Sequence, residues 1–149
     1  MPYMKYDSTV EAETPVALPG NQLRLPAGIL GFEQFKDYVL LANPAEMPFA
    51  WLRVVDSASL AFVVINPFIA MPDYAPDIPD ADVEYLGLKD PSDALLFSIV
   101  TLRGSNGATL NLKGPIVINR HTHTGKQVII ANANNYSVEH PLPVAAATV

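Results

Sequence analysis

The 149-residue chain contains no cysteine. This absence excludes a disulfide framework, thiolate ligands for zinc and a cysteine nucleophile. Long apolar runs are also missing: no stretch approaches the roughly 18 apolar residues that span a bilayer, and residues 1–15 lack the apolar segment of a secretory signal. We therefore expect a cytoplasmic protein that neither enters a membrane nor carries a structural metal.

Basic residues are scarce. The chain has 9 Lys and Arg against 15 Asp and Glu, which gives a net charge of −6. This balance disfavours direct contact with the phosphates of a nucleic acid and favours a basic protein partner. Much of the acidic excess lies between positions 73 and 93, which hold a single basic residue, Lys89; the acidic residues there are Asp73, Asp77, Asp80, Asp82, Glu84, Asp90 and Asp93.

Half of the residues are apolar, prolines number 14, and helix-forming blocks rich in Ala, Glu and Lys are missing. This composition predicts an all-β, mainly antiparallel fold, a compact β-barrel-like or bent-sandwich single domain with one or two short helices. We expect residues 1–19 to form a flexible leader or weak edge segment, residues 20–137 to form the β domain, and residues 138–149 to form a loose tail.

Residues 108–119, ATLNLKGPIVIN, show the clearest pattern in the chain. Ala108, Leu110 and Leu112 alternate with polar residues, which is typical of a half-buried strand. The β-branched run 116–118 predicts a second strand buried on both faces. Because proline lacks an N–H group and disfavours a helical conformation in the residue before it, the pair at 114–115 predicts a corner between the two strands.

The same reasoning predicts strands at 21–25, 38–42, 51–55, 60–65, 94–102 and 126–131, with a hairpin turn at 103–107. Residues 71–79 hold three prolines and should form a loop or an edge. Residues 80–88 predict a short helix, with Val83, Leu86 and Tyr85 facing inward. Phe32 and Phe35 suit one helical turn that packs both rings on the core.

His121 and His123 flank Thr122, and in a strand their side chains would share one face and could begin a metal site. Zinc needs three or four ligands, and the third histidine, His140, lies in the expected tail, so a solvated turn is the preferred interpretation. The chain lacks a G-x-S-x-G motif and a complete phosphate-binding loop. We therefore expect no enzyme activity and no cofactor.

Asn66, Asn111 and Asn119 each end or interrupt a predicted strand. Such amides commonly satisfy backbone groups at turns, and we expect this for at least two of the three. Phe68 and Tyr74 lie in a proline-rich segment outside the predicted strands. Aromatic residues in such a position usually pack inside, and if exposed they would anchor a partner.

Several segments follow one another in a distinctive order: PAGILGFEQFKDYVLL, LAFVVINPF, DY at 73–74, ATLNLKGPIVIN, GKQVII and a closing Tyr136. Over about residues 25–136 the chain resembles the FliW flagellar assembly factor family. The resemblance implies a non-enzymatic cytoplasmic protein with a compact, barrel-like β fold that binds flagellin. It also implies binding to the RNA-binding translational regulator CsrA, which relieves repression of flagellin synthesis, with flagellin competing for the same factor.

The partner surface is expected on the rim at 66–82 and the neighbouring edge at 111–119. It combines positions that match family motifs with acidic residues, and its members are Asn66, Pro67, Phe68, Asp73, Tyr74, Asp77, Asp80, Asp82, Asn111, Lys113 and Asn119. We expect a monomer. Two alternatives stay open: a small β-barrel that binds a small ligand or metal, with hydrolytic activity, and a self-associating structural subunit.

Overall fold

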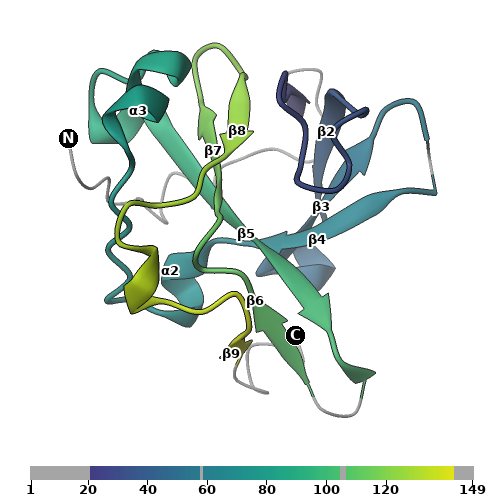
Figure 1. Cartoon of the computed structure of the whole chain (residues 1–149). Helices are drawn as coiled ribbons and strands as arrows, with labels where there is room; N and C mark the ends of the chain where they lie inside the picture. The colour runs from purple at the N-terminus through teal and green to yellow at the C-terminus, as the bar shows by residue number, and fades with distance from the viewer. Residues whose placement is uncertain (1–20, 58, 105–106, 143–149) are drawn as a thin grey trace.

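A computed structural model describes residues 21–57, 59–104 and 107–142 of the chain. It shows a bent, mainly antiparallel sheet with a few short helices (Figure 1). The strands are β1 (Gln22–Arg24), β2 (Asp37–Ala42), β3 (Phe49–Val54), β4 (Ala61–Ile65), β5 (Ala94–Leu102), β6 (Ala108–Leu110), β7 (Ile116–Asn119), β8 (Gly125–Gln127) and β9 (His140–Leu142). The predicted fold class is confirmed, in its bent and not its closed form.

The sheet is organised around β5, which crosses the centre of the molecule (Figure 1). The first part of β5 pairs with β7, from Ala94 with Asn119 to Phe97 with Ile116. Its second part pairs with β4 on one edge and with β6 on the other. Strands β6 and β7 therefore lie along successive stretches of β5, and the chain turns between them at Gly114 and Pro115, which confirms the predicted corner.

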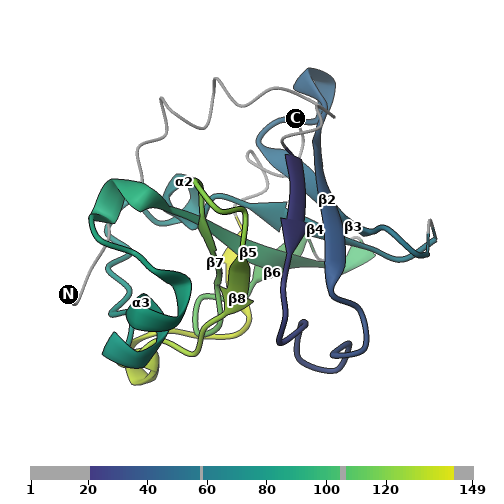
Figure 2. The same cartoon turned by 90° about the horizontal axis from the view of Figure 1, so that it is seen from above.

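Two apolar cores lie on the two faces of the bent sheet. In β5, Leu96 and Val100 belong to the core beneath the helices, whereas Phe97 and Ile99 face the core of the β1–β4 half. Figure 2 shows these two halves on either side, with β5 passing through both. Since successive residues of a strand point to opposite faces, a strand shared by two cores needs apolar residues on both faces, and β5 is apolar from Ala94 to Val100 except at the buried Ser98.

The two strands predicted within residues 108–119 are buried as expected. Ala108, Leu110 and Leu112 all belong to the core beneath the helices. Every residue of β7 is buried, with Ile116 and Ile118 facing one core and Val117 the other.

The helices are short: α2 (Pro67–Ala70), α3 (Asp80–Leu86) and the 3-10 turns η2 (Pro44–Glu46), η3 (Pro91–Asp93) and η5 (Ala133–Asn135). The predicted helix near 80–88 is confirmed, and it ends at Gly87, whose φ of 68° is left-handed. Leu86 is buried and Val83 partly so, but the inward direction expected for Tyr85 is wrong, because its side chain is 49% exposed. Asp82, four residues before Leu86, takes the inward position.

Two further expectations need correction, and a third lies outside the described residues. The strand predicted at 126–131 ends at Gln127, and the N–H groups of Val128 and Ile130 bond instead to the carbonyls of Pro115 and Lys113 at the corner. The tail is not loose over residues 140–142, which form β9 against β6. The leader at 1–19 and residues 143–149 lie outside the described part of the chain.

The aromatic segment after β1 packs as expected but without a helix. Two consecutive turns replace the predicted helical turn. The N–H of Phe32 donates to the carbonyl of Ile29, and the N–H of Phe35 donates to the carbonyl of Phe32. The Phe32 ring meets Phe62 edge to face, with 5.1 Å between ring centroids. In the described ranges, no helix is both long and apolar enough to cross a membrane.

Candidate partner-binding surface

The two parts of the predicted surface, residues 66–82 and 111–119, lie against each other. The Tyr74 hydroxyl donates a 2.6 Å hydrogen bond to the carbonyl of Leu112, and the Asn119 amide donates a 2.8 Å bond to the carbonyl of Leu86. These bonds tie the proline-rich loop and α3 to the strands of the corner. The expected proximity of the rim and the edge is therefore present.

Tyr74 itself lies inside the molecule. Its ring centroid is 5.5 Å from that of Phe68 and 4.9 Å from that of Tyr136, and the side chain is fully buried. Burial, and then the neighbouring Tyr136, raise the pKa of the Tyr74 phenol far above its ordinary value. Tyr74 is therefore a neutral hydrogen-bond donor that secures the loop from within.

All three asparagines bond to backbone groups. Asn66 is buried and caps α2 by accepting the N–H of Phe68, with Pro67 next to it as the buried first residue of that helix. The Asn111 carbonyl oxygen accepts the N–H groups of Lys113 and Gly114, each at 3.0 Å, and so holds the corner.

Asn119 closes the other end of the corner strand. Its carbonyl oxygen accepts the N–H groups of His121 and Thr122, while its amide group reaches Leu86. The expectation that these asparagines serve turns is confirmed for all three.

Asp82 forms an internal ion pair. Its carboxylate lies 2.5 Å from the Lys126 ammonium, and only 12% of its side chain is exposed. The same ammonium lies 5.3 Å from the centroid of the Tyr85 ring, within range of a cation–π contact. Asp82 therefore joins α3 to β8, and Tyr85 covers the pair from outside.

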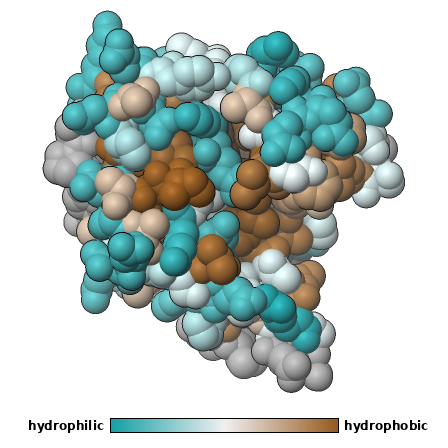
Figure 3. Space-filling model, viewed as in Figure 1, coloured by the Kyte–Doolittle hydropathy of each residue, from teal (hydrophilic) through white to brown (hydrophobic). Residues whose placement is uncertain are grey.

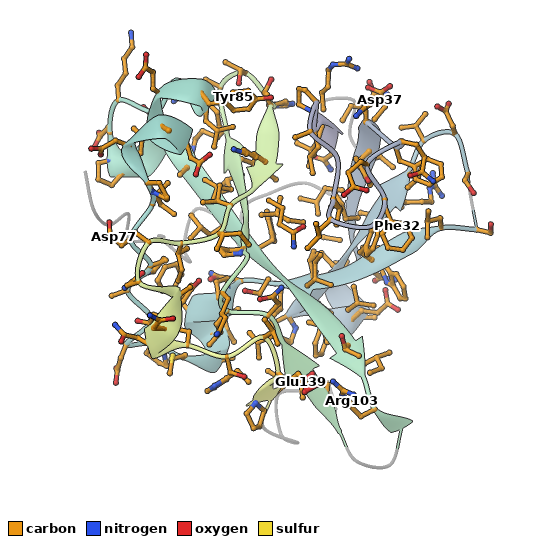
Figure 4. All side chains as sticks on the ribbon, viewed as in Figure 1. Phe32, Asp37, Asp77, Tyr85, Arg103 and Glu139 are labelled. Carbon is orange, nitrogen blue, oxygen red and sulfur yellow. The ribbon has the colours of Figure 1, made fainter. Side chains whose placement is uncertain are left out.

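The remaining acidic residues of the segment stand on the surface. We call Asp73, Asp77, Asp80, Glu84 and Asp90 the acidic rim; all are exposed except Asp77, which is half-buried. Asp77 is fixed through its backbone, whose N–H donates to Asn132 at 2.8 Å and whose carbonyl accepts the N–H of Ala131 at 2.7 Å. Figure 4 shows Asp77 and Tyr85 on the side of the molecule that carries α3.

The two histidines do not share a face. His121 lies in a turn, and its Nε2 is 2.9 Å from an Asp93 carboxylate oxygen, whereas His123 Nδ1 lies 3.1 Å from the carbonyl of Gln22. The two imidazoles therefore do not lie side by side, and the preferred interpretation of a turn is confirmed, because residues 120–122 form a turn and the φ of His123 is +60°. Within the described ranges, no group of three His, Cys, Asp or Glu residues could hold a metal ion.

Asp93 is the most strongly hydrogen-bonded carboxylate of the acidic segment. It accepts the N–H groups of Lys89 and Asp90 at 3.0 Å each, in addition to its contact with His121. The N–H of Lys89 makes the largest contribution to lowering the pKa of Asp93, and His121 also lowers it. Asp93 therefore organises the turn before β5.

The sequence interpretation missed two exposed apolar side chains, Leu30 and Ile129, which are 76% and 61% exposed. Neither stands out from the sequence, because Leu30 directly follows the buried Ile29 and Ile129 lies between the buried Val128 and Ile130. Figure 3 shows apolar side chains gathered in the middle of this face of the molecule.

Together these features define a small, bent β domain in which most polar side chains at the expected site secure its own loops, and in which the charged rim is acidic. The model of the family described as FliW protein matches residues 7–142. The chain therefore belongs to the FliW family.

Similar proteins agree with this assignment. The chain is 42% identical over 115 residues to a protein of Leptospira biflexa serovar Patoc named flagellar assembly factor FliW, covering 76% of this chain and 75% of that protein. A protein of the same name from Moorella thermoacetica is 36% identical over 126 residues, covering 83% and 79%. A solved structure titled crystal structure of the flagellar assembly factor FliW superposes with a TM-score of 0.76 at 38% identity, covering 85% of this chain and 88% of that one.

Proposed function

We propose that this protein acts in flagellar assembly in the cytoplasm as a monomeric, non-enzymatic binding protein. It binds flagellin, and it binds the translational regulator CsrA and relieves the repression of flagellin synthesis. Membership of the FliW family and the names of the relatives support the role in flagellar assembly. The acidic rim supports the choice of a basic, RNA-binding partner.

The acidic rim is the observation that carries this proposal. Asp73, Asp80, Glu84 and Asp90 are exposed on a protein whose net charge is −6. A surface of one sign attracts an oppositely charged partner at long range and increases the rate of association. The same negative field would repel RNA from a complex of the two proteins.

Calorimetry with purified CsrA tests this assignment. Reversal of Asp73, Asp77 and Asp80 to lysine should weaken binding at least tenfold and reduce its dependence on salt, because fewer attractive charge pairs remain to be screened. The matched control reverses Glu46, Asp56 and Glu139, which are exposed and outside the rim. Both triple variants change the net charge by 6, so unchanged affinity in the first, or equal losses in the two, would remove the rim from the interface.

Sedimentation with purified flagellin tests the other partner. A specific complex of standard size buries roughly 1,200–2,000 Å² and should appear as a one-to-one species. Self-association of the protein alone, with no species containing flagellin, would instead favour the structural-subunit alternative.

A further inference from the structure

A groove of about 160 Å³ separates the turn after β1 from the segment that follows β8. Its lining residues are Ala27, Gly28, Leu30, Glu33, Gln127 and Ile129. The two highly exposed side chains, Leu30 and Ile129, stand on opposite walls. Figure 3 shows apolar side chains at the surface on both sides of the middle of this face.

One wall of the groove is the edge of the extended segment that continues from β8. The N–H groups of Val128 and Ile130 bond to the carbonyls of Pro115 and Lys113 at 2.9 and 3.1 Å. This two-residue spacing is that of an extended backbone, so the N–H of Ile129 between them points the opposite way, away from the corner. Between described residues, neither the N–H nor the carbonyl of Ile129 makes a backbone hydrogen bond.

The side-chain amide of Gln127, at the end of β8, joins the Leu30 wall to the corner. The side-chain carbonyl of Gln127 accepts the N–H of Leu30 at 2.9 Å, and its NH₂ group donates to the carbonyl of Gly114 at 3.2 Å. These are the hydrogen bonds that a peptide group would make between two strands. The Leu30 wall is therefore fixed relative to β8 and the corner by side-chain hydrogen bonds.

The opposite wall is closely packed and carries a negative charge. Gly28 has a φ of +71°, and a Cβ atom there would lie 2.5 Å from Glu33 Cα, so the turn is closely packed. The N–H of Gly31 lies 3.1 Å from a carboxylate oxygen of Glu33 and lowers the pKa of that carboxyl group. Glu33 is the one charged residue among those that line the groove, so a basic group on a partner would complement it.

We propose that the groove binds an extended segment of a partner protein by strand addition to the Ile129 edge. The main chain of the segment pairs with Ile129, and a large apolar side chain lies between Leu30 and Ile129. A lysine or arginine two residues along, on the same face of the added strand, meets Glu33. This surface goes beyond the proposed function, because it shares no residue with the acidic rim. It recognises an extended main chain and an apolar side chain, whereas the rim attracts positive charge.

Amide chemical shifts of the ¹⁵N-labelled full chain test the proposal directly. The probe is a blocked seven-residue peptide with leucine at its third position, lysine at its fifth and threonine elsewhere. Saturable shifts centred on Ile129 and Leu30 are expected. Aspartate in place of the leucine should weaken binding at least tenfold, and glutamate in place of the lysine several-fold; no saturable shift at Ile129, or equal binding by the aspartate peptide, would overturn the proposal.

N-methylation of the probe separates strand addition from side-chain docking. Successive N–H groups of a strand point to opposite sides, so only one of two adjacent positions can donate to the carbonyl of Ile129. One of two peptides singly methylated at neighbouring positions should bind at least tenfold more weakly, and the other should bind normally. Equal affinities of the two methylated peptides would contradict strand addition.

Charged substitutions in the groove supply the complementary test. Leu30→Glu and Ile129→Glu place carboxylates at exposed positions, so the fold should persist while peptide affinity falls at least tenfold. Leu102→Glu is the matched control, because Leu102 is 66% exposed and lies at the end of β5, outside the groove. Loss of binding in the control, or its retention in both groove variants, would refute the assignment. Since these experiments use neither flagellin nor CsrA, their outcome is independent of the proposed function.

Discussion

The hydroxyl of Tyr74 donates to the carbonyl of Leu112 across 38 residues of chain, at 2.6 Å and in a fully buried setting. This bond joins the proline-rich loop to the corner between β6 and β7. The expected partner surface is built on both segments, so the bond links the stability of the domain to the shape of that surface.

Tyr74→Phe should lower the free energy of unfolding by about 1–3 kcal/mol, because it leaves the buried carbonyl of Leu112 without its donor. Urea unfolding followed by circular dichroism measures the change. The control is Tyr85→Phe, which removes a hydroxyl from a half-exposed ring and should alter stability by less than about 0.5 kcal/mol. Equal effects of the two substitutions would show that the bond to Leu112 contributes little.

Asn119→Ala should cost about 1–3 kcal/mol, since it removes the donor to Leu86 and the acceptor for two N–H groups of the following turn. The Leu86 carbonyl belongs to α3. In native-state hydrogen exchange, the substitution should therefore increase the exchange rates of the α3 amides, relative to the wild type, more than those of the β3 amides. Asn134→Ala, at an exposed position of η5, is the control and should leave both quantities unchanged. Uniform loss of protection across both elements would instead indicate global destabilisation.

Local spacing was enough to predict β5 and the corner beside it. Period-2 alternation from Ala108 to Leu112 and the β-branched run after Pro115 are properties of neighbouring residues, and burial followed them directly. The short helix near α3 was predicted for the same reason. Its acidic first turn is a local signal, although the predicted helix ran to residue 88 and the observed one ends before Gly87.

Features that depend on distant parts of the chain could not be predicted in this way. Asp82 is internal because Lys126, 44 residues away, lies beside it. The groove between Leu30 and Ile129 forms because the Gln127 amide bonds to Leu30, 97 residues away in the chain. The sequence around Ile129 alone does not reveal it. The strand β9 is three residues long and contains Pro141, so only its pairing with β6 reveals it.

Asp93 should make stability depend on pH in the acid range. Hydrogen bonds from Lys89 and from His121 hold its pKa below the ordinary value of 3.8 in the folded state. A carboxyl group with a depressed folded-state pKa stabilises the fold above its unfolded pKa, and this contribution is lost as the pH falls through the folded value. The difference in unfolding free energy between the wild type and Asp93→Asn should therefore shrink below about pH 4.

Urea unfolding at a series of pH values measures this difference. His121→Ala should preserve most of the pH dependence, because the N–H of Lys89 makes the larger contribution to the pKa of Asp93. A difference between the wild type and Asp93→Asn that stays constant from neutral pH to about pH 3 would contradict the assignment.

Gly28 and Gly31 are a matched pair of positions. Comparing alanine at the two separates the cost of a positive φ from the cost of a steric clash of the added Cβ atom. Both have a positive φ, +71° and +89°, so alanine at either position should cost about 1–2 kcal/mol through its conformation alone. Only at Gly28 would the added Cβ meet backbone, 2.5 Å from Glu33 Cα, whereas nothing lies within 4 Å at Gly31. Gly28→Ala should therefore be less stable than Gly31→Ala by at least about 1 kcal/mol in urea unfolding.

The same pair tests whether the turn sets the width of the groove. To relieve the contact at Gly28, the Glu33 backbone must move, and this displaces the wall that faces Ile129. Gly28→Ala should then weaken binding of the leucine–lysine probe peptide several-fold under conditions where both variants are fully folded, while Gly31→Ala binds like the wild type. If Gly28→Ala is destabilised but binds the peptide normally, the close packing of Gly28 on Glu33 serves stability alone, and the groove owes its shape to the Gln127 bridge.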